Sequence, residues 1–410
     1  MADLSKRKIL VLTSTFPRWA GDREPPFVYE LSRRLARHFT VHVLAPHAPG
    51  AKEVEDMDGV RIFRFRYFWG EREKLAYEGG ILPNLKQHPW RFILVPFFLL
   101  GALAKLIRLL RADSYEAIHA HWLLPQGLVA ILSRAASRSG CPILCTSHGG
   151  DLFALRGGLF RMLKRFVLSR IQGLTVVSRA MKNEVSSLGN RDLLTDIIPM
   201  GVDLTKDFVP PRNAVCRISG QILFVGRLVE KKGLIYLIRA MPAILQAHPE
   251  SRLLIAGSGP EQRDLKNEAE RFSLGGRVIF LGAVGNRQLP ELYQGTEIVV
   301  FPSIVAADGD QEGFGLVQVE ALGCECGVVA TDLPALRDII TDGETGLIVP
   351  QRNESALAEK VIFLLDHPDI RAELGRKGRA FVRERYDWDM ISDRYRGMIE
   401  TMVATGKPSG

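Results

Sequence analysis

The sequence has few cysteines, and nothing in it indicates a disulfide framework or a secretory leader. It contains 410 residues and five cysteines, and neither Cys141/Cys145 nor Cys324/Cys326 joins a second pair or a histidine cluster at zinc spacing. We therefore expect reduced thiols in the cytosol. The first residues, Met1 to Lys8, are charged and precede only a short apolar strand, so we expect no signal peptide.

Long apolar runs are scarce as well. The segment from Phe92 to Ala104 is apolar, but it has 13 residues and contains Pro96 and Gly101. A helix that spans a bilayer needs about 20 apolar residues. We expect a core helix here, and an interfacial membrane helix is the alternative, because Arg91 and Lys105 flank the segment.

Acidic side chains are under-represented in the first half of the chain. Residues 1–200 hold 29 Lys and Arg against 17 Asp and Glu, a net charge of +12, whereas the remainder holds 25 against 29, a net charge of −4. This asymmetry predicts an anionic partner for the first half, such as an anionic membrane surface or a lipid phosphate. The sequence has no zinc-finger spacing, aromatic-basic RNA signature or helix-turn-helix pattern, so we expect no nucleic-acid partner.

Apolar strands alternate with amphipathic helices in both halves of the chain. A strand at Lys8 to Leu12, a helix at Phe27 to His38 and a strand at Val41 to Ala45 predict a βαβ opening. The strand Gln221 to Val225 and the helix Leu234 to His248 predict a second such opening. Further strands are predicted at Val60 to Arg64, Ala117 to Ala120, Ile143 to Ser147 and Gly173 to Val177. The pattern predicts an α/β protein with two doubly wound parallel sheets.

A stretch in the second half has the features of a phosphate site. The apolar strand Ile298 to Phe301 is followed by a polar loop and by an apolar run from Leu316 that predicts a helix. A helix start offers unpaired N–H groups and the positive end of a dipole, so it favours an anion. Gly313 and Gly315 let a ligand approach the backbone closely.

The same stretch carries two carboxylates, Glu312 and Glu320, which we expect to face one cleft. Carboxylates do not bind phosphate, but they accept hydrogen bonds from sugar hydroxyls. Phosphate on backbone amides and hydroxyls on two glutamates together describe a nucleotide sugar.

A second anion site is predicted after the strand Gln221 to Val225. Gly226, Arg227 and Lys232 follow this strand and lead into a helix start. The Arg227 guanidinium can bind two oxygens at once, and Lys232 adds a point charge, so a diphosphate fits this position. The alternative is an ordinary solvated basic turn.

Two histidine sites follow strands of the first half, His119-Ala120-His121-Trp122 and His148-Gly149-Gly150-Asp151. Ligands of open α/β sheets bind at the carboxyl ends of strands. His148 can hydrogen-bond a hydroxyl of a donor sugar or help to neutralise charge near a β-phosphate. His121 either lines the same cleft or is a structural histidine.

Taken together, the stretch Glu-Gly-Phe-Gly-Leu-Val-x-x-Glu-Ala at residues 312–321 resembles the signature of retaining GT-B glycosyltransferases of family 4, also called glycosyltransferase group 1. The resemblance implies two Rossmann-like domains that face a cleft. It places an acceptor-side domain at residues 1–205, a nucleotide-sugar-binding domain at 212–384, and a helix at 385–410 that returns to the first domain.

The resemblance also implies roles for individual residues. The donor-binding set comprises Gly21, Gly226, Arg227, Lys232, Gly257, Gly282, Glu312, Gly313, Phe314, Gly315, Leu316 and Glu320. The catalytic set comprises His148, Glu312, Arg227 and Lys232, and the acceptor side comprises His121 and Asp151. Asp308-Gly309-Asp310 has the spacing of a metal motif found in another glycosyltransferase fold, but the two-domain pattern leads us to expect no metal and no other cofactor.

The implied activity is metal-independent transfer of a sugar from a nucleoside-diphosphate sugar to an acceptor hydroxyl, with retention of the anomeric configuration. The basic first half and its apolar segment favour a lipid-linked or polyanionic acceptor, and hence a role in polysaccharide or glycolipid assembly, in the cytoplasm and peripherally at the inner face of the membrane. A soluble small-molecule acceptor is the alternative. Two alternatives are a nucleotide-sugar epimerase of the same fold and a non-catalytic nucleotide-sugar-binding scaffold. Release of the nucleoside diphosphate only in the presence of an acceptor would separate the transferase from both.

Overall fold

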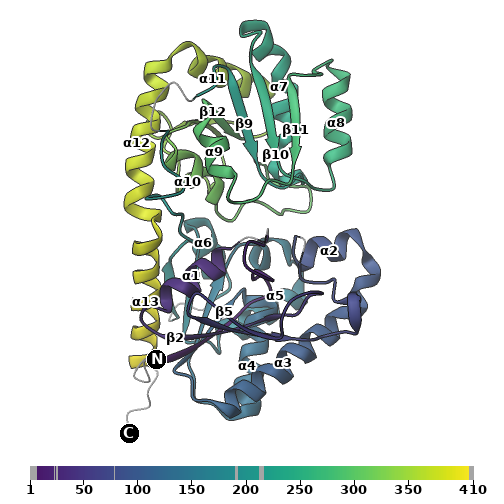
Figure 1. Cartoon of the computed structure of the whole chain (residues 1–410), viewed down its shortest axis with the longest axis vertical. Helices are drawn as coiled ribbons and strands as arrows, with labels where there is room; N and C mark the ends of the chain where they lie inside the picture. Colours follow the sequence, from purple (N-terminus) through teal and green to yellow (C-terminus); the bar gives the residue numbers. More distant parts are fainter. Residues whose placement is uncertain are drawn as a thin grey trace. The chain divides into compact units, whose positions relative to one another are not determined.

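The chain forms two compact units, each built on one sheet (Figure 1). A computed structural model describes residues 7–22, 24, 26–77, 79–189, 193–211 and 217–405. Unit 1 lies within Met1–Val177, Met181–Pro199 and Ile391–Gly410, and unit 2 within Ser178–Ala180 and Met200–Met390. The predicted domain boundaries stay predictions, and residue 212 lies outside the described part of the chain.

Unit 1 contains an eight-stranded sheet in the order β3-β4-β2-β1-β5-β6-β7-β8. All neighbouring strands are parallel except the antiparallel pair β3–β4. The strands are β1 (Lys8–Leu12), β2 (Thr40–Pro46), β3 (Val54–Met57), β4 (Val60–Phe65), β5 (Ala117–His121), β6 (Ile143–Ser147), β7 (Gly173–Val176) and β8 (Leu194–Ile197). The central strands β5, β6 and β7 are buried along their whole length, as in parallel sheets covered on both faces.

The helices of unit 1 connect these strands. They are α1 (Phe27–Leu35), α2 (Ile81–Gln87), α3 (Leu94–Ala112), α4 (Leu128–Ser137), α5 (Gly158–Leu168) and α6 (Arg179–Ser187), with short helical turns η1 (Gly70–Arg72), η2 (Pro89–Ile93), η3 (Leu123–Gly127) and η4 (Gly150–Ala154). The last helix, α13 (Trp388–Thr405), belongs to unit 1 from Ile391 onward. Its Tyr395 hydroxyl donates a 2.9 Å hydrogen bond to the Ile198 carbonyl, so the predicted return of the C-terminal helix is confirmed.

Helix α3 buries one stripe and exposes another. Its buried residues recur every four positions, as expected for one face of a helix: Leu94, Phe98, Ala102, Leu106 and Leu110. The preceding turn and the first half of the helix expose large apolar side chains instead, namely Trp90, Phe92, Ile93, Phe97 and Leu100. Within the described residues, Pro89–Ala112 is the one helical segment long and apolar enough to cross a bilayer by length and composition, with a mean hydropathy of 2.1.

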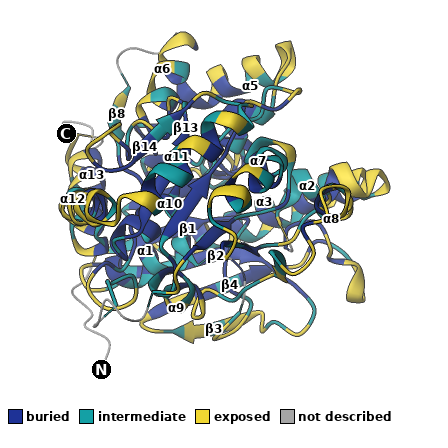
Figure 2. Ribbon diagram, turned by 90° about the horizontal axis from the view of Figure 1, so that it is seen from above, coloured by how far each residue is buried: buried dark blue, intermediate teal, exposed yellow. Residues whose placement is uncertain are grey.

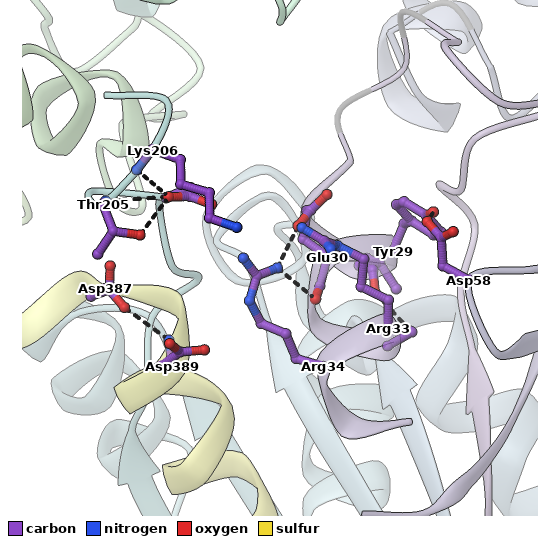
Figure 3. Close-up of polar contacts among 12 residues, drawn as sticks. Tyr29, Glu30, Arg33, Arg34, Asp58, Thr205, Lys206, Asp387 and Asp389 are labelled. Atoms are coloured by element: carbon purple, nitrogen blue, oxygen red, sulfur yellow. Dashed lines mark hydrogen bonds and ion pairs between the residues drawn. The ribbon is translucent and has the colours of Figure 1, made fainter. Parts of the chain in front are cut away.

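Polar side-chain contacts stabilise helix α1 and the start of helix α13 (Figure 3). On α1, Glu30 accepts from Arg33 at 2.7 Å and also pairs with Arg34 one turn away, which is the spacing that brings helix side chains together. The Tyr29 hydroxyl bonds to Asp58, which lies between β3 and β4. In unit 2, the Asp387 carboxylate accepts from the backbone N–H of Asp389 at 3.0 Å and so caps the start of α13.

Unit 2 contains a six-stranded, fully parallel sheet in the order β11-β10-β9-β12-β13-β14. Its strands are β9 (Gln221–Val225), β10 (Arg252–Ala256), β11 (Val278–Gly282), β12 (Ile298–Phe301), β13 (Gly327–Thr331) and β14 (Leu347–Val349). Its helices are η6 (Glu230–Lys232), α7 (Leu234–Ala247), α8 (Gln262–Arg271), α9 (Leu289–Gln294), α10 (Leu316–Gly323), α11 (Glu354–Asp366) and α12 (Pro368–Tyr386). In both units buried strands lie beneath helices whose outer faces are exposed (Figure 2). The predicted pair of doubly wound α/β sheets is confirmed.

Several predicted boundaries were wrong. Helix α1 ends at Leu35 rather than His38, and α3 extends eight residues beyond the apolar run, to Ala112. Strand β5 runs to His121, so His119 and His121 lie within the strand rather than after it. Because residues two apart in a strand share a face, the two histidine rings lie side by side, with centroids 4.3 Å apart. Strands β3 and β8 lie at sheet edges and contain no buried residue, and neither gave an apolar signal in the sequence.

Candidate functional site

In unit 2 three loops leave the carboxyl ends of β9, β10 and β12 and approach one another closely. A Cβ atom on Gly257 would lie 1.8 Å from the Gly226 carbonyl oxygen, and one on Gly233 would lie 2.0 Å from the Pro302 carbonyl oxygen. The Gly257 N–H also donates to the Gly282 carbonyl oxygen at the end of β11. Any side chain at Gly257 or Gly233 would force the loops apart, so these glycines hold the predicted donor loops together.

Two ion pairs join the loop after β9 to the loop after β12. The Lys232 ammonium pairs with the Glu312 carboxylate, and the Lys231 ammonium lies 3.2 Å from the Asp310 carboxylate. Burial raises the pKa of the Glu312 carboxyl, but the ammonium groups of Lys232 and Lys231 more than offset this effect and hold the pKa below its ordinary value. Arg227 is half-buried in the same loop as the two lysines. The structure thus pairs two of the four predicted catalytic residues, Lys232 and Glu312, and a third, Arg227, lies in the same loop as Lys232.

Asp310 is engaged in its ion pair, and Asp308 Oδ1 accepts a hydrogen bond from the backbone N–H of Asp310. Across the described residues, no three His, Cys, Asp or Glu side chains are grouped in a way that could hold a metal ion. Asp308 and Asp310 therefore have partners of their own within the loop that carries Glu312. The expectation that no metal is required stays a prediction.

Helix α10 begins directly after the glycine-rich stretch. Gly315 precedes its first residue, Leu316, and no side chain caps the amides of its first turn. These amides are the groups that the sequence predicts for a phosphate. Phe314 is buried, and its ring lies 5.5 Å from that of Tyr386, so this side chain anchors the loop to α12. Gly313 and Gly315 flank the anchor.

Glu320 lies one turn into α10 and contacts a residue that the sequence did not indicate. The Tyr293 hydroxyl donates a 3.0 Å hydrogen bond to Glu320 Oε2. Burial raises the pKa of the Glu320 carboxyl to about 7, although the bond from Tyr293 works in the opposite direction. Tyr293 lies in the unremarkable run Glu-Leu-Tyr-Gln of α9, and no spacing rule could have linked it to Glu320.

In unit 1 the histidine sites meet at the ends of β5 and β6. His121 Nδ1 lies 2.9 Å from His148 Nε2, and the two rings lie edge to edge, with centroids 5.2 Å apart and planes inclined by only 9°. Trp122 and Phe27 pack against the His148 ring, with centroids 4.9 and 5.0 Å away. The predicted neighbours His121 and His148 are therefore in direct contact.

These histidines are neutral at physiological pH. Burial lowers the pKa of His148 and that of His119 to about 3, and it lowers the pKa of His121 well below its ordinary value. A neutral imidazole has one donor and one acceptor nitrogen. His148 is consequently suited to hydrogen-bond a hydroxyl, and the alternative in which its positive charge neutralises a phosphate is disfavoured.

Asp151 joins the two histidine loops. It is buried, its Oδ2 accepts from the Leu123 N–H and its Oδ1 accepts from the Ser147 hydroxyl, both at 2.7 Å. Burial raises the pKa of its carboxyl despite these bonds. The arrangement supports the turn that follows β5 and the end of β6, next to which His121 and His148 lie, and a contact between Asp151 and an acceptor stays a prediction.

The loop after β1 contains Gly21, which has a positive φ of 82°. Arg18 and Asp22 on either side form a bidentate pair, with Nε–Oδ2 and Nη2–Oδ1 distances of 2.9 and 2.8 Å. Gly21 thus occupies a turn held by its neighbours, and the predicted contact of this turn with a donor stays a prediction.

Two family models match the chain: Glycosyltransferase Family 4 over residues 26–206 and Glycosyl transferases group 1 over residues 219–381. A phosphatidyl-myo-inositol mannosyltransferase from Mycolicibacterium smegmatis is 30% identical over 297 residues, which cover 72% of this chain and 73% of that protein. The chain belongs to glycosyltransferase family 4.

Further similarities extend over nearly the whole chain of this family 4 enzyme. A GDP-mannose-dependent alpha-(1-6)-phosphatidylinositol monomannoside mannosyltransferase from Mycolicibacterium smegmatis is 26% identical, and the match covers 93% of this chain and 95% of that protein. Among solved structures, sucrose-phosphate synthase from Thermosynechococcus elongatus superposes with a TM-score of 0.77 at 23% identity, covering 98% of this chain and all of that chain. The structural likeness confirms the GT-B fold, and the family identifies the protein as a glycosyltransferase.

Proposed function

We propose that this glycosyltransferase moves a sugar from a nucleoside-diphosphate sugar to a hydroxyl of a lipid-linked acceptor, with retention of configuration and without a metal. The observation that carries the proposal is the Lys232–Glu312 pair, which joins the loops that follow β9 and β12 in unit 2. This pair brings a cation and a carboxylate together in a loop cluster whose glycines, Gly233 and Gly257, let the loops pack closely against one another. We propose that the carboxylate accepts sugar hydroxyls.

The leaving diphosphate would be stabilised by charge from three sources. Arg227 and Lys232 supply positive side chains, and the uncapped amides at the start of α10 supply N–H donors. Such groups act most strongly where negative charge grows during the reaction. Glu312 and Glu320 would accept hydrogen bonds from donor-sugar and ribose hydroxyls, and His148 would hydrogen-bond the sugar. In the front-face mechanism implied by the family, the leaving phosphate oxygen takes the acceptor proton.

A binding panel tests the donor class. The purified protein is heated with GDP-mannose, UDP-glucose and ADP-glucose, each with EDTA and no added metal. We expect one nucleotide class to raise the melting temperature, because a ligand that binds only the folded state stabilises it. GDP-mannose comes first in the panel because a full-length relative is named for it. No shift with any donor, with or without a divalent ion, would contradict the proposal and leave the scaffold alternative.

Transfer itself is tested by product analysis. Nucleoside diphosphate should appear only when a lipid acceptor such as phosphatidylinositol is added, and the anomeric coupling of the product should match that of the donor. Inversion would contradict the retaining mechanism. Release of the diphosphate without any acceptor would favour an epimerase or hydrolase.

We also propose that the enzyme acts at an anionic membrane surface. The α3 apolar patch, defined as Trp90, Phe92, Ile93, Phe97 and Leu100, has four side chains that are 59–63% exposed. The C-terminal half of the same helix exposes Arg108 and Arg111. Exposed aromatic and aliphatic side chains beside basic residues fit the boundary between acyl chains and anionic headgroups. Because the opposite stripe of α3 is buried in unit 1, we propose that the helix lies on the membrane and does not span it.

Co-sedimentation with vesicles tests this surface. We expect binding to vesicles that contain phosphatidylglycerol, weaker binding to phosphatidylcholine alone, and partial release in high salt. Ile93→Glu with Leu100→Glu should abolish binding, whereas Ile370→Glu, at an exposed apolar position of α12, should not. Equal vesicle binding by all variants would contradict the proposal that the α3 apolar patch contacts the membrane. Dimerisation through the patch without vesicles would instead identify a second copy of the chain as its partner.

A further inference from the structure

The contact between His121 and His148 restricts where their protons lie. Nδ1 of His121 and Nε2 of His148 are 2.9 Å apart, and both rings are neutral because of burial. One nitrogen must carry a proton and the other must accept it. Two arrangements satisfy this condition: His121 donates from Nδ1, or His148 donates from Nε2.

The remaining nitrogen of His121 distinguishes the two arrangements. Its Nε2 is fully buried and has no hydrogen-bond partner within the described chain. If His148 were the donor, the proton of His121 would lie on this nitrogen, and a buried N–H would be left unpaired. Orphaned buried N–H groups are rarer than under-satisfied acceptors. The favoured arrangement therefore has the His121 proton on Nδ1 and the His148 proton on its own Nδ1.

A neighbouring hydrogen-bond chain fixes His119 in a compatible state. The Ile198 carbonyl can only accept, so the Tyr395 hydroxyl donates to it at 2.9 Å and accepts from Thr175 at 3.4 Å. Thr175 in turn accepts from Thr146 at 2.6 Å, and Thr146 accepts from His119 Nε2 at 2.7 Å. With its proton on Nε2, His119 has an unprotonated Nδ1. This state is compatible with an unprotonated Nε2 on His121.

His148 differs from the other two histidines because part of its surface stays exposed, although Phe27 and Trp122 pack against its ring and remove much of its hydration. Its Nδ1 makes no hydrogen bond within the described part of the chain and is not among the fully buried, unpartnered nitrogens. A proton on this nitrogen is consequently available to a ligand at the carboxyl end of β6. A hydroxyl oxygen or another neutral acceptor would fit it.

We propose that His121 is a positioning residue that sets the tautomer of His148, so that His148 donates from Nδ1 to a hydroxyl oxygen of the donor sugar. The inference rests on the proposed function for the identity of the ligand. It adds a residue that acts through His148 and that need not touch either substrate. The sequence left two alternatives for His121, lining the cleft or a purely structural role. The positioning role proposed here differs from both.

The tautomer can be read without any substrate. Long-range proton–nitrogen correlation spectra of histidine-labelled protein distinguish Nδ1–H from Nε2–H rings, and the His148 signals are assigned by their absence in His148→Asn. We expect His148 to be an Nδ1–H ring in the parent and to lose this state in His121→Phe. His121→Asn should keep it, because the asparagine amide nitrogen occupies the place of Nδ1 and can still donate.

Binding provides the second readout. His121→Phe should lower the affinity for the nucleotide sugar about fivefold, which corresponds to the loss of one neutral hydrogen bond. The affinity for the free nucleoside diphosphate should stay unchanged. His121→Asn should bind both as the parent does. His119→Phe, which removes a buried ring of the same size beside His121, should lower the melting temperature but preserve the His148 tautomer and both affinities.

Three results would overturn the inference. They are an Nε2–H ring at His148 in the parent, an unchanged His148 tautomer in folded His121→Phe, or an equal loss of nucleotide-sugar affinity in His121→Asn and His121→Phe. Failure of the proposed function is a separate outcome, since it would appear as a parent protein that binds no nucleotide sugar, whatever its tautomer.

Discussion

The carboxyl ends of the two sheets carry opposite kinds of polar group. In unit 2 the loops present charges, with Lys232 paired to Glu312 and Lys231 paired to Asp310. In unit 1 the corresponding position holds adjacent neutral imidazoles, His121 and His148. A diphosphate needs counter-charge, whereas sugar hydroxyls need correctly placed donors and acceptors. The two edges therefore differ in charge. The unit 2 loops carry ionised groups that suit a diphosphate, with Glu312 and Glu320 proposed for hydroxyls, whereas the histidine pair of unit 1 is neutral and suits hydroxyls alone.

Burial explains how each kind of group is maintained. The side chains of Lys232 and Glu312 retain 16% and 17% exposure, so their ionised forms keep part of their hydration. His119 and His121 are almost fully buried, and the cost of burying a charge keeps them neutral. A charged group moved to the unit 1 edge would lose its hydration, and a neutral group in unit 2 would leave a diphosphate without compensation.

The largest effect is expected from removing charge in unit 2. Lys232→Met should lower kcat/KM by about 10²- to 10³-fold, because a group aimed at developing negative charge contributes most in the transition state. Lys231→Met removes the pair with Asp310 and only a secondary charge near Glu312, so it should change kcat/KM by less than about fivefold. Steady-state kinetics with the donor identified in the binding panel provide the measurement. Similar losses in both variants would show that the two lysines are not distinguished by role.

A second effect concerns the stability of the fold at low pH, and it tests whether the buried histidines of unit 1 are neutral. The pKa of His119 is about 3 in the fold and near 6.5 when unfolded, so between these values the unfolded chain binds more protons and stability falls as pH falls. His119→Gln keeps a donor for Thr146 and removes this titration, which is worth up to about 1.4 kcal/mol per pH unit. The drop in melting temperature from pH 7 to pH 5 should therefore be smaller in the variant. An equal drop in both proteins would contradict neutral burial of this ring.

A moderate effect is expected from the pH dependence of ribose binding. The pKa of Glu320 is raised to about 7, so the carboxylate that we propose for the ribose hydroxyls predominates only above this pH. Nucleoside-diphosphate affinity should fall severalfold from pH 8 to pH 6, and Glu320→Gln should flatten this dependence. Tyr293→Phe removes a bond to the carboxylate and should move the midpoint to higher pH. Calorimetric titration at several pH values checks all three, and a flat profile in the parent would exclude Glu320 as the titrating contact.

The smallest effect is expected from removing metal ions. If Lys232 and Arg227 supply the counter-charge, EDTA should leave the transfer rate unchanged, and Mg²⁺ or Mn²⁺ should not increase it. Asp310→Asn should likewise leave the metal response flat, because this carboxylate is paired with Lys231. A rate that depends on a divalent ion would mean that counter-charge in unit 2 is not supplied by side chains alone.

Sequence patterns predicted the parts of the molecule in which local chemistry and fold agree. Strands such as β9 and β12 are short apolar runs that end in glycine or proline, and their predicted bounds match the structure. The edge strand β3 was missed because exposed edges need no apolar residues. The same limit applies to the site. Glu312 and Lys232 belong to readable motifs, but the bond between Tyr293 and Glu320 depends on the packing of α9 against α10. The contact between His121 and His148 depends on the register of β5 and β6.

The glycine contacts between the unit 2 loops have a consequence for recombination among relatives. Gly257 touches the Gly226 carbonyl and Gly233 touches the Pro302 carbonyl, so each loop is shaped by the backbone of another. A chimera whose crossover falls between these partners would combine loops that were never selected to fit. Exchange of donor preference between family members should succeed when residues 226–320 are transferred as a single block, which also keeps the Lys232–Glu312 pair, and it should fail when one loop is grafted alone.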